Sequence, residues 1–274
     1  MQTESLQTFV QAAKPHIAHK SPPRSSGIIQ IKMKLDATAA QLDAEVVRTS
    51  EDIRRRYREN KNWRYHTKEW MYKNIPVQGK DVLDFGCGTG EIATQLAFLG
   101  ANRVYALDVT PGLLDSTGRR AELDGVSDRV ETICGMIQDV EPRPVDVIVA
   151  FAVLHHCFPL ENIMPSLVRW LKPGGVFVAV EPFVAVETVE RLRNVSGVPY
   201  EPLDEGERKL NSADLRYVKS HFAKTEEKYF RVLSRFGRLM PAADPLFSRL
   251  DRLILALPFA SKLAGTAVIV GRQS

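Results

Sequence analysis

Apolar residues between Lys80 and Glu181 form short continuous runs, and these runs alternate with longer amphipathic stretches. A short apolar run closed by glycine, proline or polar residues is typical of a buried strand, whereas an apolar period of about 3.6 residues is typical of a helix. Strands that alternate with helices predict a parallel, doubly wound sheet. The runs predict strands over 81–85, 103–108, 129–134, 145–150 and 175–181, and the amphipathic stretches predict helices over 91–99, 111–123 and 160–171.

The alternation stops after Glu181. Residues 183–226 are mostly polar, and we interpret them as an insertion between the fifth and sixth strands. Two further strands are predicted over 227–233 and 266–270. The expected fold class is therefore α/β, with a doubly wound and mostly parallel sheet of seven strands.

A helical stretch over 245–262 separates the last two strands. Its segment Leu246–Leu263 is amphipathic, with Arg249, Arg252 and Lys262 among leucines. Because a helix usually buries its apolar stripe against the core, we expect this segment to pack onto the sheet. An apolar acceptor channel or a contact with a membrane surface are the alternatives.

The chain before the first strand divides in two. Residues 1–36 include a stretch rich in proline, serine and glycine and predict a flexible leader. Residues 37–76 predict a helical cap, in which one helix begins near Ser50 and another covers 63–74. Residues 77–274 form the main domain.

Composition narrows the class of protein. The 274 residues carry a net charge of +4, which is too small to indicate nucleic-acid binding. Cys87, Cys134 and Cys157 form no C-x-x-C pair, so we predict neither a metal site nor a disulfide framework. Without a signal peptide or an apolar run of about 20 residues, we expect a cytoplasmic protein that has no stable membrane insertion. The oligomeric state cannot be read from the sequence.

The strongest chemical signal follows the first strand. Gly86, Gly88 and Gly90 occupy alternate positions directly after Phe85, and a helix begins near Glu91. Glycine lets the backbone turn sharply and approach a ligand closely, and the free N–H groups of the helix start face the same place. Because ligands of open α/β sheets bind at the carboxyl ends of the strands, this loop predicts a ligand site.

A dinucleotide site would lie at the same position with a different spacing. Its fingerprint is G-x-G-x-x-G, and Glu91 stands where the third glycine is required. A carboxylate there would face the pyrophosphate at the helix N-terminus, and the two negative charges would repel each other. The dinucleotide interpretation is therefore disfavoured.

The segment Asp84-x-Gly86-x-Gly88-x-Gly90 resembles the first motif of the class I S-adenosylmethionine-dependent methyltransferases. The resemblance covers roughly residues 80–181. It implies a Rossmann-like methyltransferase domain over 77–274, with the 183–226 insertion on the acceptor side. It also implies S-adenosyl-L-methionine as cofactor, released as S-adenosyl-L-homocysteine, with contacts from Asp84, Gly86, Cys87, Gly88 and Gly90.

The second strand of such a domain ends in an acid, and here that acid is Asp108, 24 residues after Asp84. A carboxylate at this point can accept hydrogen bonds from both ribose hydroxyls of the adenosine, each worth about 1.5–3 kcal/mol. Val109 beside it would pack on one face of the adenine.

The third strand leads to Met136, where members of the family commonly carry an acid that contacts the adenine amino group. That contact is left to Gln138, Asp139 or a backbone carbonyl. Met136 and Ile137 are predicted to supply apolar walls for the ring.

The fourth strand leads into Phe151-Ala-Val-Leu-His-His156, which resembles the Leu-His-His variant of many small-molecule methyltransferases. Enzymes that methylate amino groups of nucleic acids carry Asn/Asp-Pro-Pro-Tyr/Phe at this position, so no nucleic-acid partner is expected. Phe151 is a predicted cofactor contact. Tyr65 and His66 in the helical cap are also predicted contacts, with simple helix packing of the cap as the alternative.

His155 and His156 are the candidate catalytic residues. Methyl transfer from a sulfonium is an in-line displacement that mainly requires alignment, and a base is needed only if the acceptor must lose a proton. Histidine titrates near neutral pH and can serve as that base. The alternative is that one ring packs, the other bonds a backbone carbonyl, and alignment alone suffices.

We therefore predict an enzyme that transfers the methyl group of S-adenosylmethionine to an oxygen or carbon of a small organic acceptor. Two alternatives stay open. One is a methyltransferase that acts on protein or RNA. The other is a catalytically silent protein that binds S-adenosylmethionine.

Overall fold

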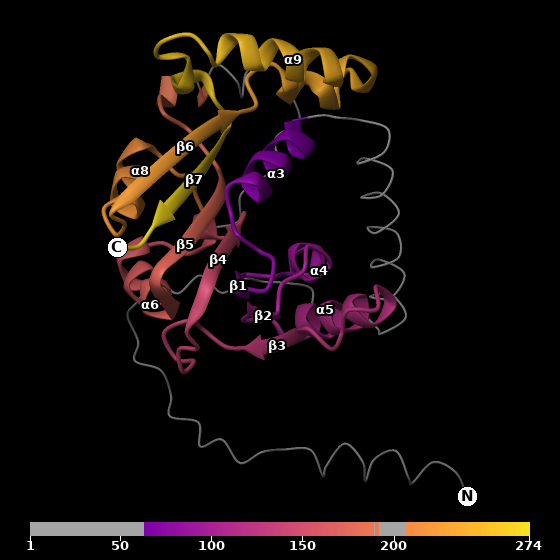
Figure 1. Ribbon diagram of the computed structural model, residues 1–274. Helices are drawn as coiled ribbons and strands as arrows, with labels where there is room; N and C mark the ends of the chain where they lie inside the picture. The colour runs from indigo at the N-terminus through magenta and orange to yellow at the C-terminus, as the bar shows by residue number, and fades with distance from the viewer. Residues whose placement is uncertain (1–62, 189, 192–206) are drawn as a thin grey trace, which may run out of the picture.

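The computed structural model describes residues 63–188, 190–191 and 207–274, which are built around a seven-stranded sheet (Figure 1). The strand order is β3-β2-β1-β4-β5-β7-β6. The pairs among β1 to β5 are parallel, whereas β7 runs antiparallel to both β5 and β6. The predicted doubly wound, mostly parallel sheet is thus confirmed. The strands are β1 (Asp81–Phe85), β2 (Arg103–Asp108), β3 (Val130–Cys134), β4 (Val145–Phe151), β5 (Leu171–Pro182), β6 (Lys224–Phe230) and β7 (Thr266–Arg272).

Helices cover both faces of the sheet. Three helices, α3, α4 and α5, bury apolar side chains such as Met71, Leu96 and Ala121 in the cluster on one face. On the other face α6 and α8 pack with Trp170 and Val218 in a second cluster. The helices are α3 (Trp63–Lys73), α4 (Glu91–Phe98), α5 (Pro111–Leu123), α6 (Met164–Trp170), α8 (Ser212–Lys219) and α9 (Asp244–Ile254), and short 3₁₀ turns are η1 (Leu154–His156), η2 (Leu160–Asn162), η3 (Ser234–Arg238), η4 (Pro241–Ala243) and η5 (Ala260–Leu263).

The first four strands start and end within one residue of the predicted positions. The expected helix over 160–171 is divided, because η2 precedes α6 and Pro165 stands in the first turn of α6. The fifth strand begins at Leu171, four residues before its expected start. These differences lie at the ends of elements, where local signals are weakest.

Both ends of the sixth strand differ from the prediction by three residues. It covers Lys224–Phe230 rather than 227–233, and it ends where Arg231 takes a positive φ of 70°. As the edge strand it is largely exposed, with the sequence KTEEKYF. Because the first residues of this strand are polar, the pattern of apolar residues predicted a strand that begins and ends three residues too late.

The predicted leader, 1–36, and the first part of the cap, 37–62, lie outside the described residues. The second cap helix is present as α3. Part of the predicted insertion, 192–206, is also outside them. The domain boundaries given above stay predictions.

Of the leucines in the amphipathic segment near the C-terminus, Leu255 packs against a core cluster and the others are exposed, so the expected packing of a whole leucine stripe onto the sheet is wrong. Helix α9 lies across the end of β6 and contacts η3, η4 and α3 (Figure 1). The buried residues of α9 are Ser248 and Asp251, whereas Leu246, Leu250 and Leu253 are exposed.

A buried carboxylate explains this orientation. Asp251 accepts hydrogen bonds from the backbone N–H groups of Val232, Leu233 and Ser234 and from the Ser234 hydroxyl, at donor–acceptor distances of 2.5–3.2 Å. These donors lie in the turn after β6 and have no strand partner. Asp251 therefore anchors the side of α9 that faces the protein, and Leu246, Leu250 and Leu253 point outward.

Replacing Asp251 by alanine should destabilise the fold by about 1–3 kcal/mol, because buried N–H groups would lose their acceptor. Urea unfolding of the two chains measures the difference. The matched control is Asp115→Ala, at an exposed position of α5. Equal stability losses for the two variants would contradict the anchoring role of Asp251.

Candidate functional site

The loop between β1 and α4 is held by glycines with left-handed backbone conformations. Gly86, Gly88 and Gly90 have φ values of 70°, 54° and 79°. A Cβ on Gly86 would lie 2.2 Å from Val153, and one on Gly90 would lie 2.8 Å from Thr117. A Cβ on Gly88 would meet nothing within 4 Å. Two of the glycines thus permit close packing, and the middle one borders open space where a ligand can approach.

Asp108 fixes this loop against the second strand. Its Oδ2 accepts a hydrogen bond from the Gly88 N–H at 3.0 Å, and its Oδ1 accepts one from the Thr110 N–H at 2.9 Å. Each carboxylate oxygen has a second lone pair. The predicted adenosine-binding acid therefore lies in the glycine loop, where it also holds the backbone in place.

Asp84 is fully enclosed on the other side of the loop. Its pKa is raised to about 7, mainly by burial and also by the charges of Asp108 and Glu91, whereas the hydrogen bond from the Ala93 N–H and the charge of Lys68 oppose the rise. Its Oδ2 has no hydrogen-bond partner among the described residues. A buried acceptor without a partner is costly, so this oxygen is suited to a cationic ligand group.

Lys68 of α3 is a site residue that the sequence analysis missed. Its ammonium group forms an ion pair with Glu91 at the start of α4 and lies 5.2 Å from the centre of the Phe151 ring. Burial lowers the pKa of Lys68, although Glu91 opposes that shift. Burial would raise the pKa of Glu91, but its ion pair with Lys68 and its hydrogen bonds with Lys68 and Gln95 lower it. This pair ties the cap helix to the glycine loop.

The other predicted contacts around the loop differ in accessibility. Val109 is exposed, and Met136 and Phe151 are partly buried. Ile137 is 1% exposed and belongs to the core, so it has little surface to offer a ligand. Burial raises the pKa of the Cys87 thiol, which lies in the core beside Thr117 and stays protonated at neutral pH.

Tyr65 and His66 are near each other in α3, with ring centres 5.3 Å apart. His66 Nδ1 lies 3.4 Å from Glu69 Oε2. His66 also lines a cavity formed by α3, β6 and α9, whose other walls include Trp63, Trp70 and Tyr229. The structure therefore links His66 to that cavity, whereas Lys68 is the cap residue that contacts the glycine loop.

His155 and His156 follow β4 in the turn η1, and each ring binds a glutamate. His155 Nδ1 lies 2.8 Å from Glu181 Oε2, and Glu181 also accepts the backbone N–H groups of Val153, Leu154 and His155. His156 Nδ1 lies 2.5 Å from Glu207 Oε1. Because a carboxylate only accepts hydrogen bonds, both rings donate through Nδ1, and a neutral ring held in this way has its lone pair on Nε2.

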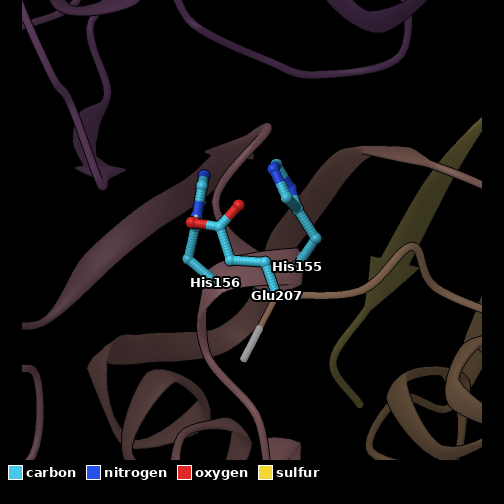
Figure 2. A group of neighbouring side chains, drawn as sticks. All are labelled: His155, His156 and Glu207. Carbon is cyan, nitrogen blue, oxygen red and sulfur yellow. Dashed lines mark hydrogen bonds and ion pairs between the residues drawn. The ribbon is translucent and has the colours of Figure 1, made fainter. Parts of the chain in front are cut away.

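The two rings lie side by side with centres 3.9 Å apart, and the Glu207 carboxylate lies next to the His156 ring (Figure 2). His155 is buried, whereas the side chain of His156 is 29% exposed. Of the two, His156 is the more accessible to a substrate. Sequence reasoning missed Glu207, because it is 51 residues from His156 in a stretch that otherwise resembles a solvated surface.

His155, His156 and Glu207 offer ligand atoms within 4.8 Å of one another, which is close enough to consider a divalent cation. The sequence predicted no metal site. The hydrogen bond between His156 and Glu207 engages the carboxylate with the ring rather than leaving it directed at a metal position. The arrangement fits a carboxylate-oriented base better than a metal centre.

The fold and the loop geometry agree with a match to a known family. Residues 82–175 match the model of the methyltransferase domain. Residues 82–175 are therefore a methyltransferase domain. The matched part contains the glycine loop, Asp108 and the histidine pair of this methyltransferase domain.

Curated relatives support the same family over part of the chain. The ribosomal protein L11 methyltransferase of Acinetobacter baumannii strain AYE is 34% identical over 140 residues, which are 50% of this chain and 43% of that protein. The probable protein arginine N-methyltransferase 6.2 of Oryza sativa subsp. indica is 38% identical over 113 residues, covering 39% of this chain and 28% of that protein. The chain spans less than half the length of these relatives.

Solved structures share the fold at low sequence identity. A chain of the complex between the Haloferax volcanii Trm112 methyltransferase activator and a methyltransferase has a TM-score of 0.55 at 18% identity, covering 85% of this chain and 97% of that one. The [4+2]-cyclase SpnF has a TM-score of 0.54 at 19% identity, covering 76% and 80%. The Haemonchus contortus phosphoethanolamine N-methyltransferase 2, solved with S-adenosylhomocysteine, has a TM-score of 0.52 at 16% identity, covering 77% and 52%.

The raised pKa of Asp84 predicts a specific pH dependence of stability. With a pKa of about 7 in the folded chain and about 3.9 in the unfolded chain, the contribution of Asp84 to stability is most favourable below about pH 4 and declines as the pH rises to about 7. Asp84→Asn should remove this contribution and be more stable than the wild type above neutral pH. Urea unfolding at a series of pH values, from acidic to mildly alkaline, measures the stability difference between the two chains, with Asp115→Asn as control. Identical dependence of stability on pH in Asp84→Asn and the wild type would contradict the raised pKa of Asp84.

Proposed function

We propose that this chain transfers the methyl group of S-adenosylmethionine to an oxygen or carbon of a small organic acceptor. The observation that carries the proposal is the loop at the carboxyl end of β1, where the Asp108 carboxylate accepts from the Gly88 N–H beside open space. The strand that leads into this loop carries the unpartnered Oδ2 of Asp84. Ligands of doubly wound sheets bind at this end of the strands.

The residues of the loop fit the chemistry of this cofactor. Asp108 keeps lone pairs for the ribose hydroxyls, and Val109 presents exposed apolar surface for the adenine. The Asp84 oxygen would pair with the methionyl ammonium, which offsets the cost of its burial. Gly88 lets the cofactor approach the backbone. When bound, the cofactor supplies an activated methyl group on a sulfonium.

The acceptor must then lie in line with that methyl group. For a hydroxyl or an acidic carbon, His156 would take the departing proton at Nε2 while Glu207 holds the ring and stabilises its positive charge. Oxygen or carbon of the acceptor forms the new bond to the methyl group, and the S–CH₃ bond breaks with its electron pair left on sulfur. Alignment without a base is the alternative for an acceptor that needs no deprotonation.

Two other functions are tested against this one. The ribosomal protein methyltransferase among the relatives favours a protein acceptor. The cyclase among the structures of similar fold shows why fold alone does not establish methyl transfer. Incubation with S-adenosylmethionine labelled in the methyl group distinguishes methylation of a small molecule, methylation of a protein, and binding without transfer. Label in small phenols, hydroxy acids or ketones supports the proposal, label in a protein fraction supports the first rival, and binding without transfer supports the second.

Gly88→Val should abolish binding of S-adenosylhomocysteine, because the branched side chain would occupy the open space beside the loop. Calorimetric titration measures this. Gly125→Val is a matched control, since Gly125 has a similar φ of 69° and open space around its Cβ but lies between α5 and β3. Both variants should lose some stability through backbone strain, and only Gly88→Val should lose the ligand. Retained binding would show that the loop is not the cofactor site.

His156→Ala should lower turnover of a hydroxyl acceptor by about 10²–10⁴, and Glu207→Gln should also lower it by orienting the ring less firmly. Affinity for S-adenosylhomocysteine should stay near the wild-type value. Release of S-adenosylhomocysteine from a panel of phenols and hydroxy acids provides the rate. His221→Ala and Glu122→Gln are matched controls away from the histidine pair.

Turnover within a few-fold of wild type in both His156→Ala and Glu207→Gln would mean that the enzyme works by alignment alone. Stoichiometric zinc binding that is lost in Glu207→Gln would instead assign the cluster to a metal.

A further inference from the structure

Most of the large exposed hydrophobic side chains of the described residues gather in one stretch near the C-terminus. Leu253 is 69% exposed and Phe259 is 78% exposed. Apolar residues scattered singly over a surface are ordinary, but a gathered set indicates an interaction site. The exposed hydrophobic residues within 239–263 are Leu239, Met240, Leu246, Leu250, Leu253, Leu257, Phe259 and Leu263, and we call their surface the docking face.

The helical part of the docking face is a single stripe. Leu246, Leu250 and Leu253 follow one another at spacings of four and three residues, so they project from the same side of α9. Ser248 and Asp251 are buried on the other side. Since the hydrogen bonds of Asp251 to the turn after β6 fix this orientation, the leucines are held outward by the fold itself.

The charges beside the leucines have one sign. Arg249, Arg252 and Lys262 are exposed, and no exposed residue between 239 and 263 is acidic. The two acids of this stretch, Asp244 and Asp251, are partly buried and buried. No ion pair is formed by these three cations within the described residues. The docking face therefore combines apolar surface with positive charge.

The tip of the docking face carries an aromatic ring. Phe259 has a positive φ of 64°, which turns the chain between α9 and η5. Lys262 Nζ lies 5.6 Å from the centre of its ring. An aromatic side chain beside a cation is suited to the boundary between lipid headgroups and acyl chains.

We propose that the docking face binds the surface of a membrane rich in anionic lipid. Leucines and Phe259 would enter the headgroup boundary while Arg249, Arg252 and Lys262 contact lipid phosphates. No described helix is long and apolar enough to span a membrane, so the contact is one of the surface only. A second copy of the chain is a poorer occupant, because a two-fold contact would bring the same cations together.

The position of the docking face relates it to the cofactor loop. Helix α9 follows the end of β6, and Phe230 at that end pairs with Thr266, which in turn pairs with Pro182 at the end of β5. The glycine loop follows the end of β1, which runs parallel to β4 and β5. Docking would therefore bring the edge of the sheet where β1, β5 and β6 end, which is also the edge of the glycine loop, toward the lipid.

Sedimentation of the full chain with vesicles tests the proposal. The chain should bind vesicles of phosphatidylcholine and phosphatidylglycerol more tightly than vesicles of phosphatidylcholine alone, and binding should weaken as salt is raised. Arg249→Glu and Arg252→Glu should each weaken it at least about fivefold. Leu253→Ser with Phe259→Ser should weaken it at least about tenfold. The altered side chains are exposed, and thermal unfolding verifies that the variants fold.

Matched controls lie on the other side of the molecule. Arg119→Glu reverses an exposed charge on α5, and Phe98→Ser with Leu123→Ser removes exposed apolar surface. These variants should bind vesicles like the wild type. Absence of vesicle binding by the wild type, or equal losses in the control variants, would overturn the proposal. A chain that is dimeric in solution and becomes monomeric in Leu253→Ser, without binding vesicles, would assign the docking face to a second copy.

Discussion

Backbone N–H groups at the carboxyl edge of the sheet need acceptors, because the chain leaves the strand ladder there and turns. Three carboxylates meet this requirement. Asp108 accepts from Gly88 and Thr110, and Glu181 accepts from the turn that carries the histidine pair. Asp251 accepts from the turn after β6. The glycine loop, the candidate base and the orientation of α9 all depend on this one kind of hydrogen bond.

Hydrogen bonds from backbone N–H groups also lower the cost of burying a carboxylate, and the buried acids of the site differ in how many they receive. Asp108 and Glu181 have backbone donors, whereas Asp84 has the Ala93 N–H and one oxygen without a partner. Burial, together with the charges of Asp108 and Glu91, raises the pKa of Asp84 to about 7, and its oxygen without a partner is suited to a cation. In the proposed function the cofactor supplies the cation, so part of its binding energy relieves a cost already present in the fold.

Much of this arrangement could be predicted from the sequence, because it depends on local patterns. Apolar runs located the first four strands, and the spacing of Gly86, Gly88 and Gly90 located the loop. The partners that come from distant segments could not be predicted in this way. Lys68 and Glu207 are polar residues in polar stretches, and only the tertiary fold brings them to Glu91 and His156.

The error at α9 has a related cause. An amphipathic pattern shows that a helix has two faces, but it does not show which of them contacts the protein. Packing usually selects the apolar face. Here the hydrogen bonds of Asp251 turn the side that carries Ser248 and Asp251 toward the protein, and Leu246, Leu250 and Leu253 are left at the surface.

Proton release on cofactor binding tests the central claim most directly. If a methionyl ammonium pairs with Asp84, it favours the ionised carboxylate, and a group with a pKa of about 7 then gives up its proton. Calorimetric titration with S-adenosylhomocysteine in buffers of different ionisation enthalpy measures the protons released at neutral pH. The account predicts binding with net proton release that disappears in Asp84→Asn. Binding without proton release, or release that persists in Asp84→Asn, would contradict it.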